Sequence, residues 1–421
     1  MHDAAAMNAA AAATDPNGSS QRSPSLRVLR VLTRPNLGGP TRQAIALWHA
    51  LAARGVATLL VTGAVGAGEA LLSPADHGVP ALSLAQALAA GPAAAGWVVV
   101  PELGRRLSPF ADRRAAQTLR ALLASHRPDV VHTHTSKAGV LGRRAAHAAA
   151  VGKLVHTFHG HVLQDYFPRP IGWLLGRIER HLAARTDVLC AVSASCADEL
   201  AAAGVAPRAR FHVVPPAVPL PTPLPRAEAR ARLGIAADER RVVCAGRLVP
   251  IKRVADFVRA VAALPGVHGD VCGEGPEREA LTALAAQLAP GRVHFRAARP
   301  DFARELPAYD ALLLPSVREG LPLVAVEAFA AGVPVVGYDV PGVHDALADL
   351  GRGVLVPVAA GPAGLAAAVA PFLADAGAAR SLVASARAAV ARCTPAAVAD
   401  QLLQLYRSGE CAPVPRPVPP R

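Results

Sequence analysis

The chain has 421 residues, more than a single hydrophobic core usually supports, so we expect two domains of roughly 200 residues each. Hydrophobic residues make up 52% but aromatic residues only 4%, which argues against an aromatic-rich β protein and favours α/β or all-α layers. The 44 Lys and Arg against 31 Asp and Glu give a charge of +13, which attracts phosphate-bearing partners, nucleic acid or anionic lipid.

The N-terminal segment and the cysteines indicate a cytoplasmic protein. Residues 1–25 contain an alanine run that no basic segment precedes, so we expect a disordered extension and not a signal peptide. The six cysteines include no C-x-x-C pair, which argues against disulfides and structural zinc.

The first half alternates apolar strands with longer helical patterns, as parallel α/β folds do. A strand at 26–32 is followed by a glycine turn and a helix from about residue 41 to 54. Further strands are expected at 57–61, 130–133, 154–157, 188–192 and 211–214.

A proline-rich stretch at 215–225 (PPAVPLPTPLP) predicts an interdomain linker, because proline disfavours both helix and sheet interiors. A second strand series follows it, at 241–245, 267–272, 293–295, 311–314, 334–338 and 354–356. The last helix is expected at 395–407, before a Pro-rich tail at 408–421. We therefore predict domains at 26–218 and 219–394.

Residues 354–374 carry no charge over a length that would cross a bilayer. Three prolines and two glycines interrupt this stretch, so a short strand, a turn and a helix are expected in place of a membrane span.

Two cations follow the strand at 241–245. Gly246 and Arg247 open a loop that leads to Lys252, just before a helix. Arginine can clamp phosphate oxygens and lysine adds a point charge, so the pair suits a diphosphate without a metal ion. Two solvated basic residues at the start of a helix are the alternative interpretation.

Two carboxylates follow the strand at 311–314. Glu327 lies in a run apolar enough to bury it, so it needs a partner, and a ribose diol offers two hydroxyl donors. Glu319 precedes a Gly320-Leu321-Pro322 turn, from which it can face a sugar ring. A capping glutamate plus a buried salt bridge would explain the same residues without a ligand.

The first half offers a glycine turn and a group of histidines. Gly38 and Gly39 lie between strand and helix, where backbone can approach a phosphate. The histidines are His132, His134, His156, His159 and His161. No zincin or zinc-finger spacing accompanies them, so we favour histidines that face substrate over a metal site.

Together these segments resemble the retaining glycosyltransferases of family 4, which have the GT-B fold of two Rossmann-like domains with parallel sheets facing across a cleft. The resemblance runs from about residue 26 to 407 and rests on two motifs above all, Glu319 and Glu327 in an E-x7-E spacing and G-R-L-x-P-x-K at 246–252. The patterns VVHTHTSKAG at 130–139 and HTFHGH at 156–161 look like a branch that acts in bacterial surface-polysaccharide assembly.

The resemblance implies roles for single residues. Arg247 and Lys252 hold the donor diphosphate, Glu327 binds the ribose, and Glu319 binds the transferred sugar with Gly320 and Leu321 beside it. His159 lies near the sugar's C6 hydroxyl, and Gly38 and Gly39 form a mobile loop that closes on the phosphates. His132, His134 and Lys137 are expected to contact the acceptor, and the last helix to join the first domain.

We therefore expect a metal- and cofactor-independent glycosyltransferase with a nucleotide-sugar donor, most simply a UDP-sugar. Its acceptor would be a glycan or a polyprenyl-diphosphate-linked glycan, and the basic charge suits peripheral contact with an anionic membrane. A GT-B epimerase or hydrolase of nucleotide sugars is an alternative. So is a non-catalytic polyanion-binding protein, although carboxylates at the anion site disfavour nucleic acid as a partner.

Overall fold

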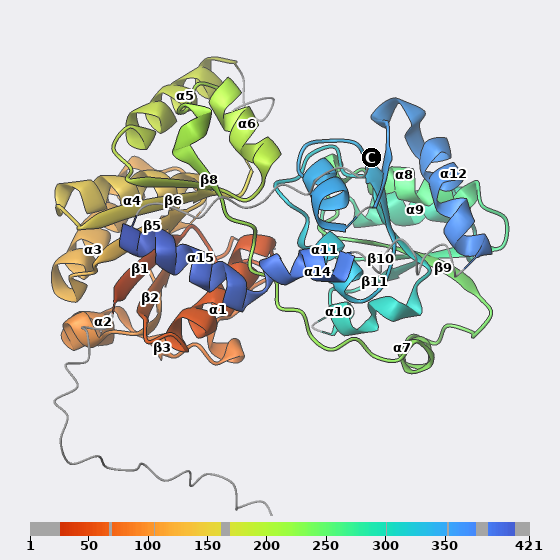
Figure 1. Cartoon of the computed structure of the whole chain (residues 1–421), viewed down its shortest axis with the longest axis horizontal. Coiled ribbons are helices and arrows are strands. Elements are labelled where there is room, and N and C mark those ends of the chain that lie inside the picture. Colours follow the sequence, from red (N-terminus) through yellow and green to blue (C-terminus); the bar gives the residue numbers. More distant parts are fainter. Residues whose placement is uncertain are drawn as a thin grey trace, which may run out of the picture.

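The computed structural model describes residues 26–66, 70–104, 106–160, 169–299, 301–351, 353–375 and 386–408. These residues form two α/β units, each built on a parallel sheet (Figure 1). The predicted α/β class with two Rossmann-like sheets is confirmed. The extension at 1–25 and the tail from 409 to 421 lie outside the described residues.

The first unit holds an eight-stranded sheet in the order β3-β4-β2-β1-β5-β6-β7-β8. Its strands are β1 (Arg27–Leu32), β2 (Ala57–Thr62), β3 (Ala81–Leu82), β4 (Gly96–Val99), β5 (Val130–His134), β6 (Lys153–Phe158), β7 (Val188–Ala191) and β8 (Phe211–Val213). Its helices are α1 (Gly39–Ala52), α2 (Leu84–Ala90), α3 (Pro109–His126), α4 (Ser136–Ala148), α5 (Arg169–Ala183) and α6 (Ala194–Ala202).

The second unit holds a six-stranded sheet in the order β11-β10-β9-β12-β13-β14. Its strands are β9 (Arg240–Ala245), β10 (Val267–Cys272), β11 (Val293–Arg296), β12 (Ala311–Leu314), β13 (Val335–Tyr338) and β14 (Val354–Val356). The helices of this unit are α7 (Arg226–Leu233), α8 (Val254–Ala262), α9 (Arg278–Leu288), α10 (Phe302–Glu305), α11 (Leu323–Ala330), α12 (Gly361–Ala374) and α14 (Ala386–Val390). The chain continues into a last helix, α15 (Pro395–Ser408).

Every strand expected from the sequence forms within one or two residues of its predicted bounds. Two strands were missed, β3 and β4, which have two and four residues. Both strands lie at the same edge of the sheet. Each is too short to show a clear run of alternating or apolar residues, so the sequence pattern alone did not separate them from loops. The linker at 215–225 forms no helix or strand, although residues 214–218 are buried.

Each sheet has a switch point at a central strand. In the first sheet β1 lies between β2 and β5, with Arg30 beside His132 in the parallel register. In the second sheet β9 lies between β10 and β12. Ligands of open parallel sheets bind at such switch points, outside the carboxyl ends of the strands. The loops after β1, β5, β9 and β12 are therefore where a site is expected.

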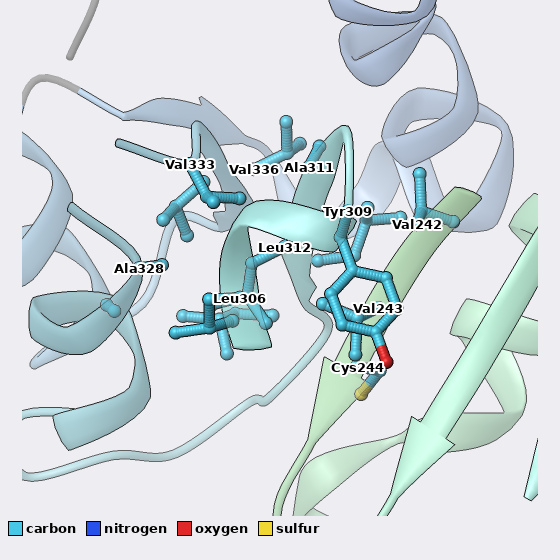
Figure 2. Packing of buried hydrophobic residues seen from close by; sticks show 14 of the residues in the cluster. Val242, Val243, Cys244, Leu306, Tyr309, Ala311, Leu312, Ala328, Val333 and Val336 are labelled. Carbon is cyan, nitrogen blue, oxygen red and sulfur yellow. The ribbon is translucent and has the colours of Figure 1, made fainter. Parts of the chain in front are cut away.

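Aliphatic side chains fill the core of the second unit. Figure 2 shows β9 and β12 contributing Val242, Val243 and Leu312 to a cluster that Leu306 and Tyr309 cover. The Tyr309 hydroxyl donates to Asp270 Oδ2 at 2.8 Å, and this fully buried carboxylate also accepts from Arg241 and Arg296. Since a buried charge must be paired, this network ties β9, β10 and β11 together.

The last helix returns to the first unit. In Figure 1 α15 lies beside α1, on the opposite side of the molecule from the rest of the chain's final third. Tyr406 and Leu402 are buried there, and Gln401 donates to the carbonyl of Val213 at 2.9 Å. The uncharged stretch at 354–374 is a strand followed by α12, and none of the described helices has the length and apolarity needed to cross a bilayer.

Two glycine loops of the second unit lie backbone to backbone. Gly273 has φ +152°, and a Cβ there would lie 1.9 Å from the carbonyl oxygen of Gly246. A Cβ on Gly275 would lie 2.3 Å from the carbonyl oxygen of Leu248, whose N–H donates to Glu274 at 2.9 Å. The G-E-G turn thus supports the loop that carries Arg247.

We expect Gly273→Ala to lower the free energy of unfolding by about 3 kcal/mol or more, because backbone on both sides must move to admit a methyl group. Gly291→Ala is the control, since Gly291 also has a positive φ (+72°) but an added Cβ meets nothing within 4 Å. That variant should lose only about 1 kcal/mol. Denaturant unfolding followed by circular dichroism measures both, and equal losses would contradict the backbone contact.

Candidate functional site

The carboxyl ends of the two sheets face each other, and the loops after β6 and β12 touch. A Cβ on Gly320 would lie 2.4 Å from the carbonyl oxygen of His159, and Gly160 lies on the other side of the contact with φ +105°. Leu321 packs against the hydrophobic clusters of both units. The sequence predicted these loops separately, and the structure brings them to one place.

The loop after β9 presents the two predicted cations differently. Arg247 is exposed, and its side chain makes no hydrogen bond or ion pair with any residue that the structure describes. Lys252 pairs with the carboxylate of Glu319, and both side chains are mostly buried. The two cations line one narrow hollow with Gly246, Pro315 and Ser316. This side of the loop therefore presents a guanidinium with no partner among the described residues and an ammonium that already has one.

Backbone contacts hold the loop that carries Glu319. The N–H of Val317 donates to the carbonyl of Ile251 at 2.9 Å, which joins this loop to the one that carries Lys252. Gly342 has φ +78°, and a Cβ there would lie 2.4 Å from the carbonyl oxygen of Glu319. The position of Glu319 is therefore fixed from both neighbouring loops.

Glu327 is buried on α11, with 2% of its side chain exposed, and its partner comes from the other unit. Arg42 of α1 donates to Glu327 Oε1 across the interface. Burial raises the pKa of Glu327, and the charge and hydrogen bond of Arg42 act against that rise. The buried salt bridge that the sequence offered as an alternative is thus present. The second oxygen of the Glu327 carboxylate has no partner among the described residues.

The glycine turn of the first unit lies against the second unit. A Cβ on Gly39 would lie 3.3 Å from Leu323, the first residue of α11. The N–H of Gly38 donates to the carbonyl of Asn36 at 2.7 Å, so the turn is closed by its own backbone. This geometry places the turn three residues from Arg42 and next to the helix that carries Glu327.

Three residues that were expected to contact the acceptor have protein partners instead. His132 is fully buried, with Nδ1 2.6 Å from the Tyr406 hydroxyl and Nε2 2.7 Å from the Thr157 hydroxyl. His134 is 2% exposed and lies between Arg30 and His159. The structure argues against direct acceptor contacts for both, because neither ring has a free nitrogen.

Lys137 is also occupied. Its Nζ donates to the carbonyls of Glu102 and Arg106 at 3.0 and 2.6 Å and lies 2.7 Å from Asp112 Oδ1. Two hydrogen bonds and one ion pair therefore occupy the ammonium, and the ion pair joins the first turns of α3 and α4. The expected acceptor contact of Lys137 is therefore replaced by a structural one.

Of the remaining histidines, the structure describes His156 and His159. His156 is buried with Nδ1 2.8 Å from the Thr133 hydroxyl, and His159 is half-buried beside Gly320. His161 lies outside the described residues. Within the ranges that the structure describes, no three His, Cys, Asp or Glu side chains are arranged to hold a metal ion.

Two arginines at the site were missed in the sequence, and each carries a signal. Arg42 lies in the first turn of α1, where the positive end of the helix disfavours a cation unless an anion is near. Arg30 lies among apolar residues in a strand that is buried from its second residue to its last. A charge in either position calls for a partner that local sequence does not supply.

Two family models match the chain. "Glycosyltransferase Family 4" matches residues 37–220, and "Glycosyl transferases group 1" matches residues 225–389. Their boundary falls in the proline-rich linker, and between them they take in both sheets.

Several curated relatives carry the name D-inositol 3-phosphate glycosyltransferase. The protein from Xylanimonas cellulosilytica is 32% identical over 419 residues, covering 91% of this chain and 97% of the relative. The match to the Nocardia farcinica protein is 34% identical and covers 61% of this chain and 60% of the relative. The match to the Mycobacteroides abscessus protein is 37% identical and covers 56% of this chain and 57% of the relative. The chain thus spans somewhat more than half the length of these last two relatives.

Solved structures share the fold. Sucrose-phosphate synthase from Thermosynechococcus elongatus superimposes with a TM-score of 0.75 at 22% identity, over 91% of this chain and 98% of that one. Anabaena HepE in complex with UDP-glucose superimposes with a TM-score of 0.72 at 20% identity, over 91% of this chain and 100% of that one. The two-sheet architecture is therefore GT-B, and with the nearly full-length match to the Xylanimonas relative it follows that the chain belongs to glycosyltransferase family 4.

Proposed function

We propose that the protein is a retaining glycosyltransferase that moves a sugar from a nucleotide-sugar donor to a glycan or lipid-linked acceptor. One arrangement carries the proposal. Arg247, Lys252 and Glu319 lie together at the switch point of the second sheet, and the backbone of His159 touches Gly320 beside them. Glu327 follows on α11, where it pairs with Arg42 of the first unit. Cations for a diphosphate and carboxylates for sugar hydroxyls are the groups that this donor needs.

The chemistry follows from where charge develops. When the bond between sugar and phosphate breaks, negative charge grows on the leaving diphosphate, and Arg247 with Lys252 stabilises it. No metal is needed for this role in our proposal. The acceptor hydroxyl attacks from the face that the diphosphate leaves, and a phosphate oxygen takes its proton. Glu319 orients the sugar, and Glu327 accepts hydrogen bonds from the ribose.

The donor and acceptor are proposed from relatives. HepE was solved with UDP-glucose, which supports a UDP-sugar for this chain. The curated relatives are named for D-inositol 3-phosphate, so a phosphorylated polyol is a second candidate acceptor beside a polyprenyl-diphosphate-linked glycan. The resemblance to surface-polysaccharide enzymes favours the glycan. Both candidates are anionic, in keeping with the charge of +13.

A donor-hydrolysis assay with and without acceptors separates this proposal from its alternatives. A transferase consumes UDP-sugar rapidly only when an acceptor is present, whereas a hydrolase or epimerase converts it alone. A non-catalytic polyanion-binding protein converts nothing. Thermal shifts with several nucleotide sugars identify the donor, since a ligand bound only by the native state raises Tm by mass action.

Arg247→Ala and Glu327→Gln should impair transfer in different ways. Arg247 is exposed and unpaired in the described structure, so its loss removes stabilisation of the transition state and should lower kcat by roughly 100-fold. Glu327 is assigned to the ribose, away from the breaking bond, so Glu327→Gln should mainly raise the donor KM. The loss of donor binding free energy should be about 1–2 kcal/mol, as expected for hydrogen bonds to a charged group.

Steady-state kinetics with varied donor and melts without ligand test the pair of variants. Both apo proteins should melt within a few degrees of the wild type. Full kcat in Arg247→Ala would mean that the diphosphate lies elsewhere, and unfolding of Glu327→Gln would mean that the carboxylate is structural.

Arg42→Ala should make donor binding depend on pH. Burial raises the pKa of Glu327 and Arg42 opposes this, so removing Arg42 raises the pKa further. Below that pKa the carboxyl is protonated and loses its charge, so the donor KM of the variant should begin to rise at a higher pH than that of the wild type as pH falls. Among the described side chains no other ion pair reaches Glu327.

Arg259→Ala is the control, because Arg259 is half-exposed and pairs only with Asp256 on its own helix. It should keep the pH profile of the wild type. A donor KM that falls at every pH in Arg42→Ala would show that Arg42 competes with the nucleotide for Glu327 and does not support it.

The first unit also offers a surface for peripheral membrane contact. Phe110 on α3 is 84% exposed and Trp173 on α5 is 64% exposed. Leu107, Ile171 and Leu174 are exposed beside them in sequence, at the N-terminal ends of the same helices. The exposed face of α3, α4 and α5 carries arginines, and the acidic side chains of these helices are paired. The exposed arginines are Arg113, Arg114, Arg120, Arg144, Arg177 and Arg180, and the acids are Asp112 and Glu179.

This face suits anionic lipid, because apolar side chains enter the interface while each arginine adds about 1 kcal/mol near the surface. Phe110→Ser with Trp173→Ser should reduce pelleting with vesicles of anionic lipid about 10-fold or more. Leu288→Ser is the control, since Leu288 is a partly exposed leucine on α9 of the other unit. Pelleting should weaken steeply with salt for every variant, and equal pelleting of all three proteins would contradict this surface.

A further inference from the structure

A buried arginine without a carboxylate lies in the middle of β1. Arg30 is 1% exposed, and its Nη2 donates to Nε2 of His134 at 2.9 Å. Its Nε and Nη1 are buried with no hydrogen-bond partner, and no described Asp or Glu forms an ion pair with it. A buried charge without a carboxylate partner destabilises the folded protein, which indicates that Arg30 has a function.

The hydrogen bonds from Arg30 can only run in one direction. A guanidinium has donors and no acceptor, so Nε2 of His134 must be an unprotonated acceptor. The proton of this imidazole is then on Nδ1, which lies 3.0 Å from Nε2 of His159 and donates to it. Nε2 of His159 is therefore also an acceptor, and the proton of His159 is on Nδ1.

Burial and charge keep both rings neutral, as this chain of bonds requires. Burial, together with neighbouring His132, Arg30, His159 and His156, lowers the pKa of His134 well below its usual value. Burial and the charge of Arg30 lower the pKa of His159 to about 4. At neutral pH neither ring competes with Arg30 as a cation.

We propose that Arg30 and His134 are positioning residues that hold His159 in the Nδ1–H tautomer, so that His159 presents a hydrogen-bond donor to an oxygen of the bound nucleotide sugar. The inference rests on the proposed function for what His159 meets, but the chain of hydrogen bonds does not. Free imidazole side chains in water favour the Nε2–H form, so the protein must select the other one.

The surroundings fix this relay in place. His132 lies against His134 with ring centroids 4.2 Å apart and is itself held by Tyr406 and Thr157. His159 is half-buried at the contact with Gly320, and its Nδ1 has no partner among the described residues. Hydrogen bonds in a row polarise one another, so the buried charge of Arg30 makes the last donor of the row stronger.

The tautomer can be read directly by long-range proton–nitrogen correlation spectra of protein with ¹⁵N-labelled histidine. In the wild type His159 should show a protonated Nδ1 and an unprotonated Nε2, and so should His134. His159→Gln identifies the His159 signals by their absence. A wild-type His159 protonated on Nε2 overturns the proposal without any other variant.

Two substitutions of His134 then test the relay. In His134→Leu the bond from His134 is lost, and His159 should shift to the Nε2–H form. In His134→Gln the amide oxygen accepts from Arg30 and the amide nitrogen donates to His159, so the Nδ1–H form should return. His49→Leu is the control, because His49 is an exposed histidine on α1. A His134→Leu protein that keeps the Nδ1–H tautomer overturns the role of His134.

Kinetics connect the tautomer to function. His134→Leu should lower kcat about 10-fold, the loss expected from one hydrogen bond made in the transition state, with most of the activity regained in His134→Gln. His159→Gln should lose at least as much as His134→Leu. The spectra need no substrate, so an expected tautomer in a protein that transfers no sugar would refute the proposed function and leave the relay standing. Normal kcat in His134→Leu with a shifted tautomer would overturn the link between them.

Discussion

Two backbones meet at Gly320 with no side chain between them, and the site depends on that contact. The carbonyl of His159 occupies the space where any other residue at 320 would place its Cβ. This closeness brings the loop of His159 against the loop that carries Glu319 and lets Arg42 reach Glu327. Each half alone would present only part of the group of residues assigned to the donor.

The charges at this interface are arranged as exchangeable pairs. Lys252 holds Glu319 within one unit, and Arg42 holds Glu327 between units, while Arg247 alone is exposed and unpaired among the described residues. A diphosphate can take the free guanidinium at little cost but must share or displace the ammonium. Under the proposed function, substrate binding would exchange partners, keep the carboxylates paired at every stage and avoid leaving a charge buried alone.

Local pattern was enough to predict the fold and the positions of the loops. Glycines and charges that directly follow apolar strands must lie at the carboxyl edge of a parallel sheet, and so Arg247, Lys252, Glu319 and Glu327 could be named in advance. The partners of His132, Lys137 and Glu327 could not. Tyr406, Asp112 and Arg42 lie between 25 and 285 positions away in sequence, and only packing decides which of several polar groups fills a buried hydrogen bond.

The return of α15 to the first sheet also sets an order of events during synthesis. Val213 ends the first sheet, and α15, which covers Val28, Val130 and Val155, begins at Pro395, roughly 180 residues later. At ribosomal rates this interval lasts on the order of 10–40 s. Throughout that time a patch of the first core and the ring of His132 lack their cover. The first unit to emerge from the ribosome is thus the last to be completed.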